Sequence, residues 1–374
     1  MFEIVKESHT NVSQCLKEII DQLGDLSTTV IDEVTFDIEK YLCSDLKMLA
    51  ILYGINPAQS DQPCIWCDYN IKNDKVDKYG NFIYSSMKIN RTLTESDTLR
   101  KNPENGTKGY KEKPIINIDF NNCVVDTLHL YLRITEKLFL ILFDWIGQND
   151  KGKINQNLSE RPLMKRFIDF LTDECKLYHV HYFKEYKTLK ESIKLRSLNS
   201  NEYDTIFSTI FKITNNEFGD TNGLTRLMVE GNGKPLDKEA NERLNVINHS
   251  FFKFFQIYQV IKNRKKVQTE NGLMNAMKNL FITIKQAKFE SCLNLTPYLH
   301  TLVHHTTEFL DKYKDIDIFN LQGFEKLNSV LRTNYARSTN KKTKIYLKQL
   351  LNVRNRNELI HFDFEINNDE IILD

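Results

Sequence analysis

Two cysteines, Cys64 and Cys67, are separated by two residues and form the clearest chemical motif in the sequence. Thiolates at this spacing can both bind one tetrahedral Zn²⁺, and the same spacing also occurs in redox pairs. A redox pair normally opens a helix in a βαβ unit, whereas this pair follows two proline-containing breaks, Asn56-Pro57 and Gln62-Pro63. The context favours a zinc knuckle, so the remaining ligands must come from a distant part of the chain.

Three of the nine histidines lie close together near the C-terminal end, at His300, His304 and His305. They follow Thr296-Pro297, a cap residue and a proline that together predict a helix start. Residues i and i+4 share one face of a regular helix, so geometry alone favours His300 and His304 as partners of the cysteines. Burial in the core for packing is the alternative for each histidine.

A second group of potential ligands consists of Cys175, His179 and His181. The alternation around these residues also suits a strand or an irregular segment, so metal binding is one of two interpretations. Residues 230–234, Glu-Gly-Asn-Gly-Lys, resemble a phosphate loop but lack its glycine spacing and its Lys-Ser/Thr ending. A turn is the better interpretation there.

Several charged residues have spacings that chemistry could use. Asp45 lies at the junction between a predicted strand and the following helix, where its side chain could simply cap that helix. Asp126 and His129 lie at i and i+3 on a long helix predicted from about Cys123 to Ile146, with Arg133 one turn further. This polar group either faces a functional site or contains a hydrogen-bonded pair on a buried helix.

The C-terminal part of the sequence contains one acidic candidate and one basic run. Glu325 opens a predicted helix, where a solvated carboxylate is the default. Lys341, Lys342 and Lys344 could follow a phosphate backbone, although such a run is more often a solvated face.

Composition indicates a folded protein without a strong overall electrostatic field. The chain has 374 residues, 41% of them hydrophobic, and its net charge of +1 means that any nucleic-acid contact must use local patches. Seven cysteines with one close pair fit a reducing compartment. The first residues lack a signal-peptide pattern, and the most apolar run, residues 138–143, is too short to span a bilayer. We therefore expect a nuclear or cytoplasmic protein that is not secreted.

Periodicity predicts a mainly α-helical protein with a small β-sheet. A short strand over residues 2–5 is followed by a helix over residues 12–23, capped by Ser8 or Thr10. A hairpin packed on one side is predicted over residues 29–42, with its turn at Asp32-Glu33. Residues 68–118 are polar and predict a long surface excursion. Further helical patterns cover residues 163–171, 203–213 and 244–261.

Taken together, these residues resemble the catalytic core of the V(D)J recombinase catalytic subunit and the Transib-type DDE transposases. The resemblance covers most of the chain, and spacing carries most of its weight. Asp45 precedes Cys64 by 19 residues and Glu325 follows His305 by 20, as in that family. The matching pieces occur in the family's order, namely residues 4–8, Asp45, the cysteine pair, residues 125–129, residues 298–300 with His305, and residues 323–325.

The resemblance implies a partial RNase H-like (DDE) core interrupted by a large helical zinc-binding insertion. The corresponding segments are 1–67, with Asp45 and the cysteine pair; 68–295, the helical insertion; and 296–374, with the histidine helix, the Glu325 helix and the basic run. The implied zinc ligands are Cys64, Cys67, His300 and His305, in place of His304. Residues i and i+5 lie about 140° apart on a regular helix, so the helix must end or distort between them, or the metal must lie beyond the end of the helix.

The resemblance further implies that three carboxylates bind two Mg²⁺ or Mn²⁺ ions for DNA cleavage and strand transfer. Asp45 and Glu325 match the second and third carboxylates. The first has no match, because the sequence begins downstream of the strand that carries it, and Asp32 or Asp37 is the alternative source. With one carboxylate missing we expect DNA binding without cleavage by this chain alone.

The resemblance also implies which residues line the active site and what the protein binds. Asp126, His129 and Arg133 match a family segment that lines the active site, and residues 228–234 loosely match a loop near the cleaved strand, where Glu230 departs from the expected basic character. We expect DNA as the partner, leave a homodimer open, and expect neither a membrane nor a small-molecule substrate. The alternative function is a helical zinc-binding interaction scaffold with no DNA role.

Overall fold

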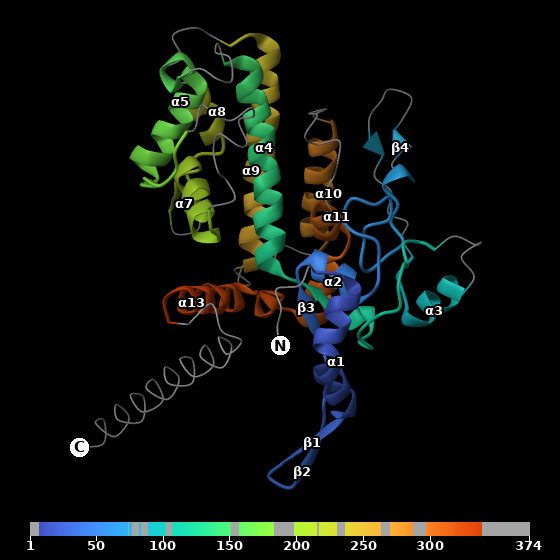
Figure 1. The fold of residues 1–374 in the computed structure, drawn as a ribbon. Helices are drawn as coiled ribbons and strands as arrows, with labels where there is room; N and C mark the ends of the chain where they lie inside the picture. Colours follow the sequence, from blue (N-terminus) through green and yellow to red (C-terminus); the bar gives the residue numbers. More distant parts are fainter. Residues whose placement is uncertain are drawn as a thin grey trace. The chain divides into compact units, whose positions relative to one another are not determined.

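The computed structural model describes residues 7–73, 75–76, 82–83, 89–101, 107–150, 157–182, 198–214, 217–229, 236–262, 270–286 and 297–338. The chain separates into two compact units, one formed by residues 1–38 with 320–374 and the other by residues 39–319. Helices predominate, and the described strands form only two-stranded sheets. The prediction of a mainly α-helical protein with little sheet is confirmed (Figure 1). The strand expected over residues 2–5 lies outside the described residues.

The first unit contains helix α1 (His9–Asp25), strands β1 (Thr28–Ile31) and β2 (Val34–Asp37), and helix α13 (Gln322–Ser338). Ser8 caps α1, because its side chain accepts a hydrogen bond from the Asn11 N–H. Asp32 and Glu33 both have positive φ angles, 50° and 67°, as the tight turn of a hairpin requires. The predicted helix and hairpin are therefore confirmed.

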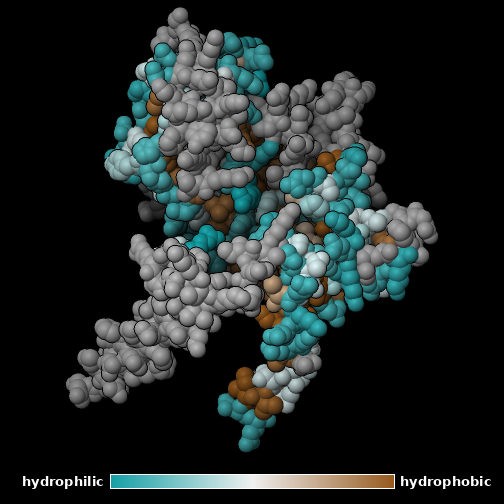
Figure 2. Space-filling model, in the orientation of Figure 1, coloured by the Kyte–Doolittle hydropathy of each residue, from teal (hydrophilic) through white to brown (hydrophobic). Residues whose placement is uncertain are grey.

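The prediction that this hairpin packs on one side is wrong. All residues of both strands are exposed (Figure 2). Ile31, Val34 and Phe36 share one face of the hairpin, and Val30 lies on the other face. The alternation of apolar residues predicts a buried face only where a second layer covers the sheet. Within the described residues no layer covers these side chains.

The second unit is built on a short parallel strand pair. Strand β3 (Leu42–Ser44) pairs with β6 (Cys123–Val125), in a register that places Leu42 opposite Cys123 and Ser44 opposite Val125. Each strand leads directly into a helix, α2 (Leu46–Leu52) and α4 (Thr127–Asn149). The long helix thus begins at Thr127 and not near Cys123, because a short apolar run cannot be assigned to helix or strand from periodicity alone.

Helices of the second unit pack around an aromatic core. Helix α4 lies alongside α9 (Lys238–Lys262), with α5 (Pro162–Asp169) and α7 (Ser200–Ile210) beside it (Figure 1). The Phe139 ring contacts Phe251 at 5.0 Å between centroids, and Phe207 stacks on Phe255 at 4.7 Å. Among the described residues, none of the helices combines the length and apolar composition that crossing a bilayer requires.

The remaining elements complete the second unit. The longer ones are helices α3 (Leu93–Lys101), α8 (Gly223–Val229), α10 (Glu270–Gln286), α11 (Pro297–His304) and α12 (Thr306–Tyr313). The short ones are strands β4 (Lys75–Val76), β5 (Phe82–Ile83), β7 (Ile213–Thr214) and β8 (Glu217–Phe218), the 3₁₀ turns η1 (Ile71–Asn73), η3 (Phe120–Asn122), η4 (Leu158–Glu160) and η9 (Asp317–Phe319), and the π-turn η5 (Phe170–Glu174).

A buried ion pair joins the end of α4 to the start of α5. The Asp150 carboxylate accepts hydrogen bonds from the Leu163 and Met164 N–H groups at 3.1 and 3.2 Å. One of its oxygens also lies 3.4 Å from Nε of Arg161, a residue that is only 1% exposed. Asp150 therefore caps α5 and neutralises a buried guanidinium at the same time.

We expect Asp150→Ala to lower the free energy of unfolding by about 3–5 kcal/mol, because it leaves the Arg161 charge buried without its partner. Urea denaturation followed by circular dichroism measures this loss. Lys165→Ala is the matched control, since it removes an exposed pair with Asp169 and should cost less than about 1 kcal/mol. Equal losses in the two variants would contradict the assignment.

Candidate metal centre

The cysteine knuckle rests on the buried strand β6. The indole Nε1 of Trp66 donates to the Cys123 carbonyl at 2.8 Å, which fixes the loop between the two cysteines. Cys67 also forms an isolated β-bridge with Asn90. Cys64 and Cys67 are 2% and 0% exposed, so both thiols point into the protein and away from solvent.

A helix break orients the two histidines. Helix α11 ends at His304, α12 begins at Thr306, and His305 lies between them with φ −119° and ψ −25°. A regular helix would separate residues 300 and 305 by about 140°. The break changes the direction of His305, and the prediction that the helix ends or distorts between the two histidines is confirmed.

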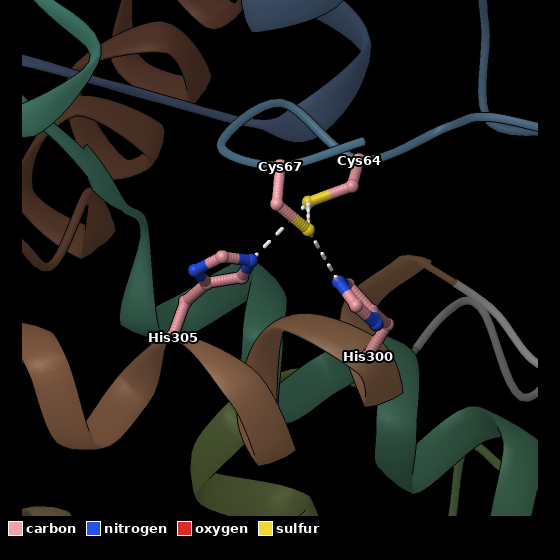
Figure 3. Close-up of side chains that lie close together, drawn as sticks. All are labelled: Cys64, Cys67, His300 and His305. Carbon is pink, nitrogen blue, oxygen red and sulfur yellow. Dashed lines mark hydrogen bonds between the residues drawn. The ribbon is translucent and has the colours of Figure 1, made fainter. Parts of the chain in front are cut away.

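The break and the knuckle bring four ligand atoms together (Figure 3). Sγ of Cys64 lies 3.3 Å from Nε2 of His305, and Sγ of Cys67 lies 3.3 Å from Nε2 of His300. The two sulfur atoms are 3.5 Å apart, and the four ligand atoms all lie within 4.8 Å of one another. All four residues are buried, although Cys64 and His305 are separated by 241 positions.

These distances fit a tetrahedral zinc ion. Zn–S bonds of about 2.3 Å and Zn–N bonds of about 2.0–2.1 Å place neighbouring ligand atoms about 3.4–3.8 Å apart. The hydrogen bond that the Cys67 thiol donates to the Cys64 sulfur, together with burial, raises the pKa of Cys67, because two sulfur atoms at this distance cannot both be ionised without a cation. The cluster could therefore hold a metal ion such as zinc, with four protein ligands and a closed coordination shell.

The surrounding side chains orient both imidazoles. Nδ1 of His305 lies 3.1 Å from a carboxylate oxygen of Glu308, which leaves Nε2 to face the sulfur atoms. The Tyr69 ring stacks on His300 with centroids 4.0 Å apart. His304 stacks on the His300 ring at 4.3 Å and is not part of the four-atom cluster. The choice of His304 from helical geometry is therefore wrong, because the helix does not continue to residue 305.

Arg91 is the residue next to this cluster that sequence reasoning missed. It lies in the segment predicted as a surface excursion, yet it is 3% exposed and its Nε donates to the Cys64 carbonyl at 3.0 Å. Tyr110 is also buried, so the predicted exposure of this segment is wrong at these positions. A polar composition did not reveal the packing, because the partner of Arg91 Nε is a backbone carbonyl of the knuckle, which becomes its neighbour only on folding.

Asp45 and Asp126 occupy equivalent places at the ends of the paired strands. Asp45 Oδ1 accepts hydrogen bonds from the Lys47 and Met48 N–H groups at 2.8 and 3.0 Å. Asp126, fully buried, likewise accepts from the first-turn N–H groups of α4. Both carboxylates therefore cap helices, as one of the two interpretations of Asp45 predicts.

His129 and Arg133 extend this polar group along α4. Nδ1 of His129 hydrogen-bonds to the Asp126 carboxylate, and this bond raises the pKa of His129 with a smaller contribution from Asp45. Arg133 Nη1 contacts the Glu136 carboxylate at 3.0 Å. The interpretation as a hydrogen-bonded pair is confirmed for Asp126 and His129, whereas Arg133 pairs with Glu136.

The other candidates fall elsewhere. Glu325 lies in the first turn of α13 with an exposed side chain, and it belongs to the first unit, as do Asp32 and Asp37, whereas Asp45 belongs to the second. Each is described within its own unit. Lys341, Lys342 and Lys344 lie outside the described residues, as do residues 230–234.

Metal binding, one of the two interpretations of Cys175, His179 and His181, is not borne out. Cys175 is buried, whereas His179 and His181 are exposed, and Nε2 of His179 lies 3.3 Å from a Glu202 carboxylate oxygen. In the part of the chain that the structure describes, the only group of at least three Cys, His, Asp or Glu ligands close enough to share an ion is the Cys2His2 cluster. The segment places its thiol and its imidazoles in different environments.

Comparison with models of protein families finds no match to this chain, and comparison with curated proteins finds none either.

The four-ligand cluster predicts a specific pattern of zinc loss. The wild-type chain should retain about one zinc per molecule, and Cys64→Ser or His305→Asn should release it because three ligands no longer close the site. His304→Asn should keep the zinc, since that ring stacks beside the cluster. Elemental analysis after dialysis measures the content, and zinc loss on replacing residue 304 but not residue 305 would refute the assignment.

The raised pKa of His129 predicts a pH effect on stability. Because its folded pKa lies above the ordinary value of 6.5, its contribution is complete below that pH and is lost as the pH rises through the folded pKa. Asp126→Asn keeps a capping oxygen but removes the charge, so the pKa of His129 should fall toward 6.5. Proton NMR titration measures this shift.

His249 supplies the control for that titration. Burial lowers its pKa, with a contribution from Lys253, and neither cause involves Asp126. Its titration should be the same in wild type and Asp126→Asn. A wild-type His129 that titrates at or below 6.5 would show that the pair does not form as described.

Proposed function

We propose that this chain is a zinc-stabilised DNA-binding protein of the DDE transposase and recombinase kind, which binds DNA without cleaving it alone. The observation that carries the proposal is the ligand set of the metal centre. The resemblance selects His305 against the preference of regular helical geometry for His304, and His305 is the residue that joins the cluster. If the pattern of cysteines and histidines were a coincidence, the fourth ligand would not be expected at the position that the family resemblance implies.

The arrangement around Asp45 also supports the proposal. In the family that the sequence resembles, a carboxylate follows a strand of the RNase H-like sheet, and Asp45 follows strand β3, which pairs in parallel with β6. An RNase H-like core extending from this strand pair is part of the proposal. So is a nuclear location, which follows from the DNA role.

The metal centre has a structural role in this proposal. When bound, a zinc ion with four protein ligands holds distant segments together and has no open position for a reacting group. The knuckle carries Cys64 and Cys67 beside strand β6, and the break between α11 and α12 carries the histidines. Metal binding therefore fixes the position of strand β6, which precedes Asp126, relative to helices α11 and α12.

Mg²⁺ or Mn²⁺ at the carboxylates would be needed for cleavage. Asp45 Oδ1 already accepts two backbone hydrogen bonds, and within the described residues neither Asp45 nor Glu325 belongs to a group of three or more possible metal ligands. Two carboxylates without a third do not fix the paired ions of this chemistry. This is the basis for proposing DNA binding without cleavage.

The helical zinc scaffold remains the second candidate, and one observation favours it. Asp45 and Asp126 both cap helices, and this role explains their positions without any catalytic function. The scaffold predicts the same zinc content but no affinity for DNA.

DNA binding separates the two candidates. We expect the zinc-loaded full chain to bind a labelled duplex in fluorescence anisotropy, with affinity falling by about ten-fold or more between 50 and 200 mM salt as phosphate contacts are screened. Cys64→Ser should weaken binding, whereas His304→Asn should leave it unchanged. No binding at low salt would leave the scaffold as the better candidate.

Cleavage is tested on the same preparation with Mn²⁺ present. We expect an intact, end-labelled duplex after incubation, for wild type and for Asp45→Ala alike. Nicking by the wild type that disappears in Asp45→Ala would refute the proposed lack of activity and would assign Asp45 as a metal ligand.

A further inference from the structure

We propose that Arg91 is a positioning residue of the metal centre, which holds the cysteine knuckle in the shape that binds the ion. Its side chain donates from Nε to the Cys64 carbonyl at 3.0 Å, and its backbone N–H donates to the Trp66 carbonyl at 2.8 Å. Two of the four residues from Cys64 to Cys67 are thus held by one residue. This inference rests on the metal centre alone and not on the DNA role.

The burial of Arg91 requires an explanation that packing does not give. A guanidinium is charged at all relevant pH values, and enclosing it is unfavourable unless hydrogen bonds and nearby negative charge compensate. Arg91 is 3% exposed, and its side-chain hydrogen bonds within the described residues go to two carbonyl oxygens, those of Cys64 and Lys108. These two bonds attach the guanidinium to the backbone of the knuckle at Cys64 and to the backbone of Lys108.

A second segment closes over the guanidinium and fixes its direction. Nη1 donates to the Lys108 carbonyl at 2.6 Å, and the guanidinium lies over the Tyr110 ring, 4.7 Å from its centroid. Gly109 has φ +89°, and a Cβ at this position would lie 3.2 Å from Nη2 and 2.9 Å from the Gln62 carbonyl oxygen. Only a glycine lets the backbone approach this closely, so the segment is shaped around Arg91.

These contacts give Arg91 the geometry of an outer-shell group. Its side-chain hydrogen bonds go to backbone carbonyls and not to the ligand atoms, and the bond from Nε fixes the backbone of Cys64. Outer-shell groups of this kind typically change metal affinity by about 10–100-fold when they are replaced. A residue with a purely structural role would change the stability of the fold and leave the affinity for metal unchanged.

The test measures metal affinity in the full-length chain. Zinc dissociation constants are obtained by competition with a chromophoric chelator, and Co²⁺ substitution reports the ligand field through its visible absorption. We expect Arg91→Met to raise the zinc dissociation constant about 10–100-fold and to alter the Co²⁺ spectrum. Arg91→Lys should be intermediate, because it keeps the charge but loses the planar donor fork.

Arg161→Met is the matched control, since Arg161 is also a buried arginine but pairs with Asp150 at the start of α5. It should lower thermal stability without changing zinc affinity. Wild-type affinity in Arg91→Met, or equal loss of affinity in Arg161→Met, would overturn the inference. If Arg91→Met does not fold, an unchanged affinity in Arg91→Lys would overturn it.

The same measurements also distinguish a failure of this inference from a failure of the metal centre or of the proposed DNA-binding function. A wild-type chain that binds no zinc would overturn the metal centre and this inference together. A wild-type chain that binds zinc but not DNA would refute only the proposed function. Weaker zinc binding in Arg91→Met would still support the positioning role.

Discussion

The convergence of two thiols and two imidazoles on one buried point is the constraint on which the rest of the second unit depends. Bringing residues 241 positions apart into contact has an entropic cost that grows slowly with loop length, and a bound metal ion can offset it. The knuckle is fixed to strand β6 through Trp66, so the same point also determines where the parallel strand pair lies. The fold and the metal centre are therefore parts of one arrangement.

The carboxylates show how one residue type can serve two purposes. Asp45 and Asp126 follow paired strands and cap the helices that begin there, which satisfies backbone N–H groups that a helix start leaves without partners. A catalytic carboxylate at the end of a strand would occupy the same place. For this reason the position of Asp45 does not distinguish the proposed DDE-like function from a purely structural role.

Several features follow from local sequence because their physical causes are local. The cap at Ser8, the turn at Asp32-Glu33 and the strand-to-helix change at Asp45 depend on a few neighbouring residues. Other predictions failed where the cause was not local. Cys123 begins a strand because β3 lies beside it, and Val30 is exposed because nothing described covers the hairpin. Periodicity reports which face is apolar but not whether another layer meets it.

The sequence by itself determined the donor types of the metal centre and the segments that carry them, since only cysteines and histidines at these spacings offer such ligands. It also determined that helices dominate. Helical spacing favoured His304 and the resemblance favoured His305. Tertiary structure placed His305 in the cluster with His304 stacked beside it, because a helix break changes the direction of one side chain. It also decided the burial of Arg91, whose partners are backbone carbonyls that become neighbours only after folding.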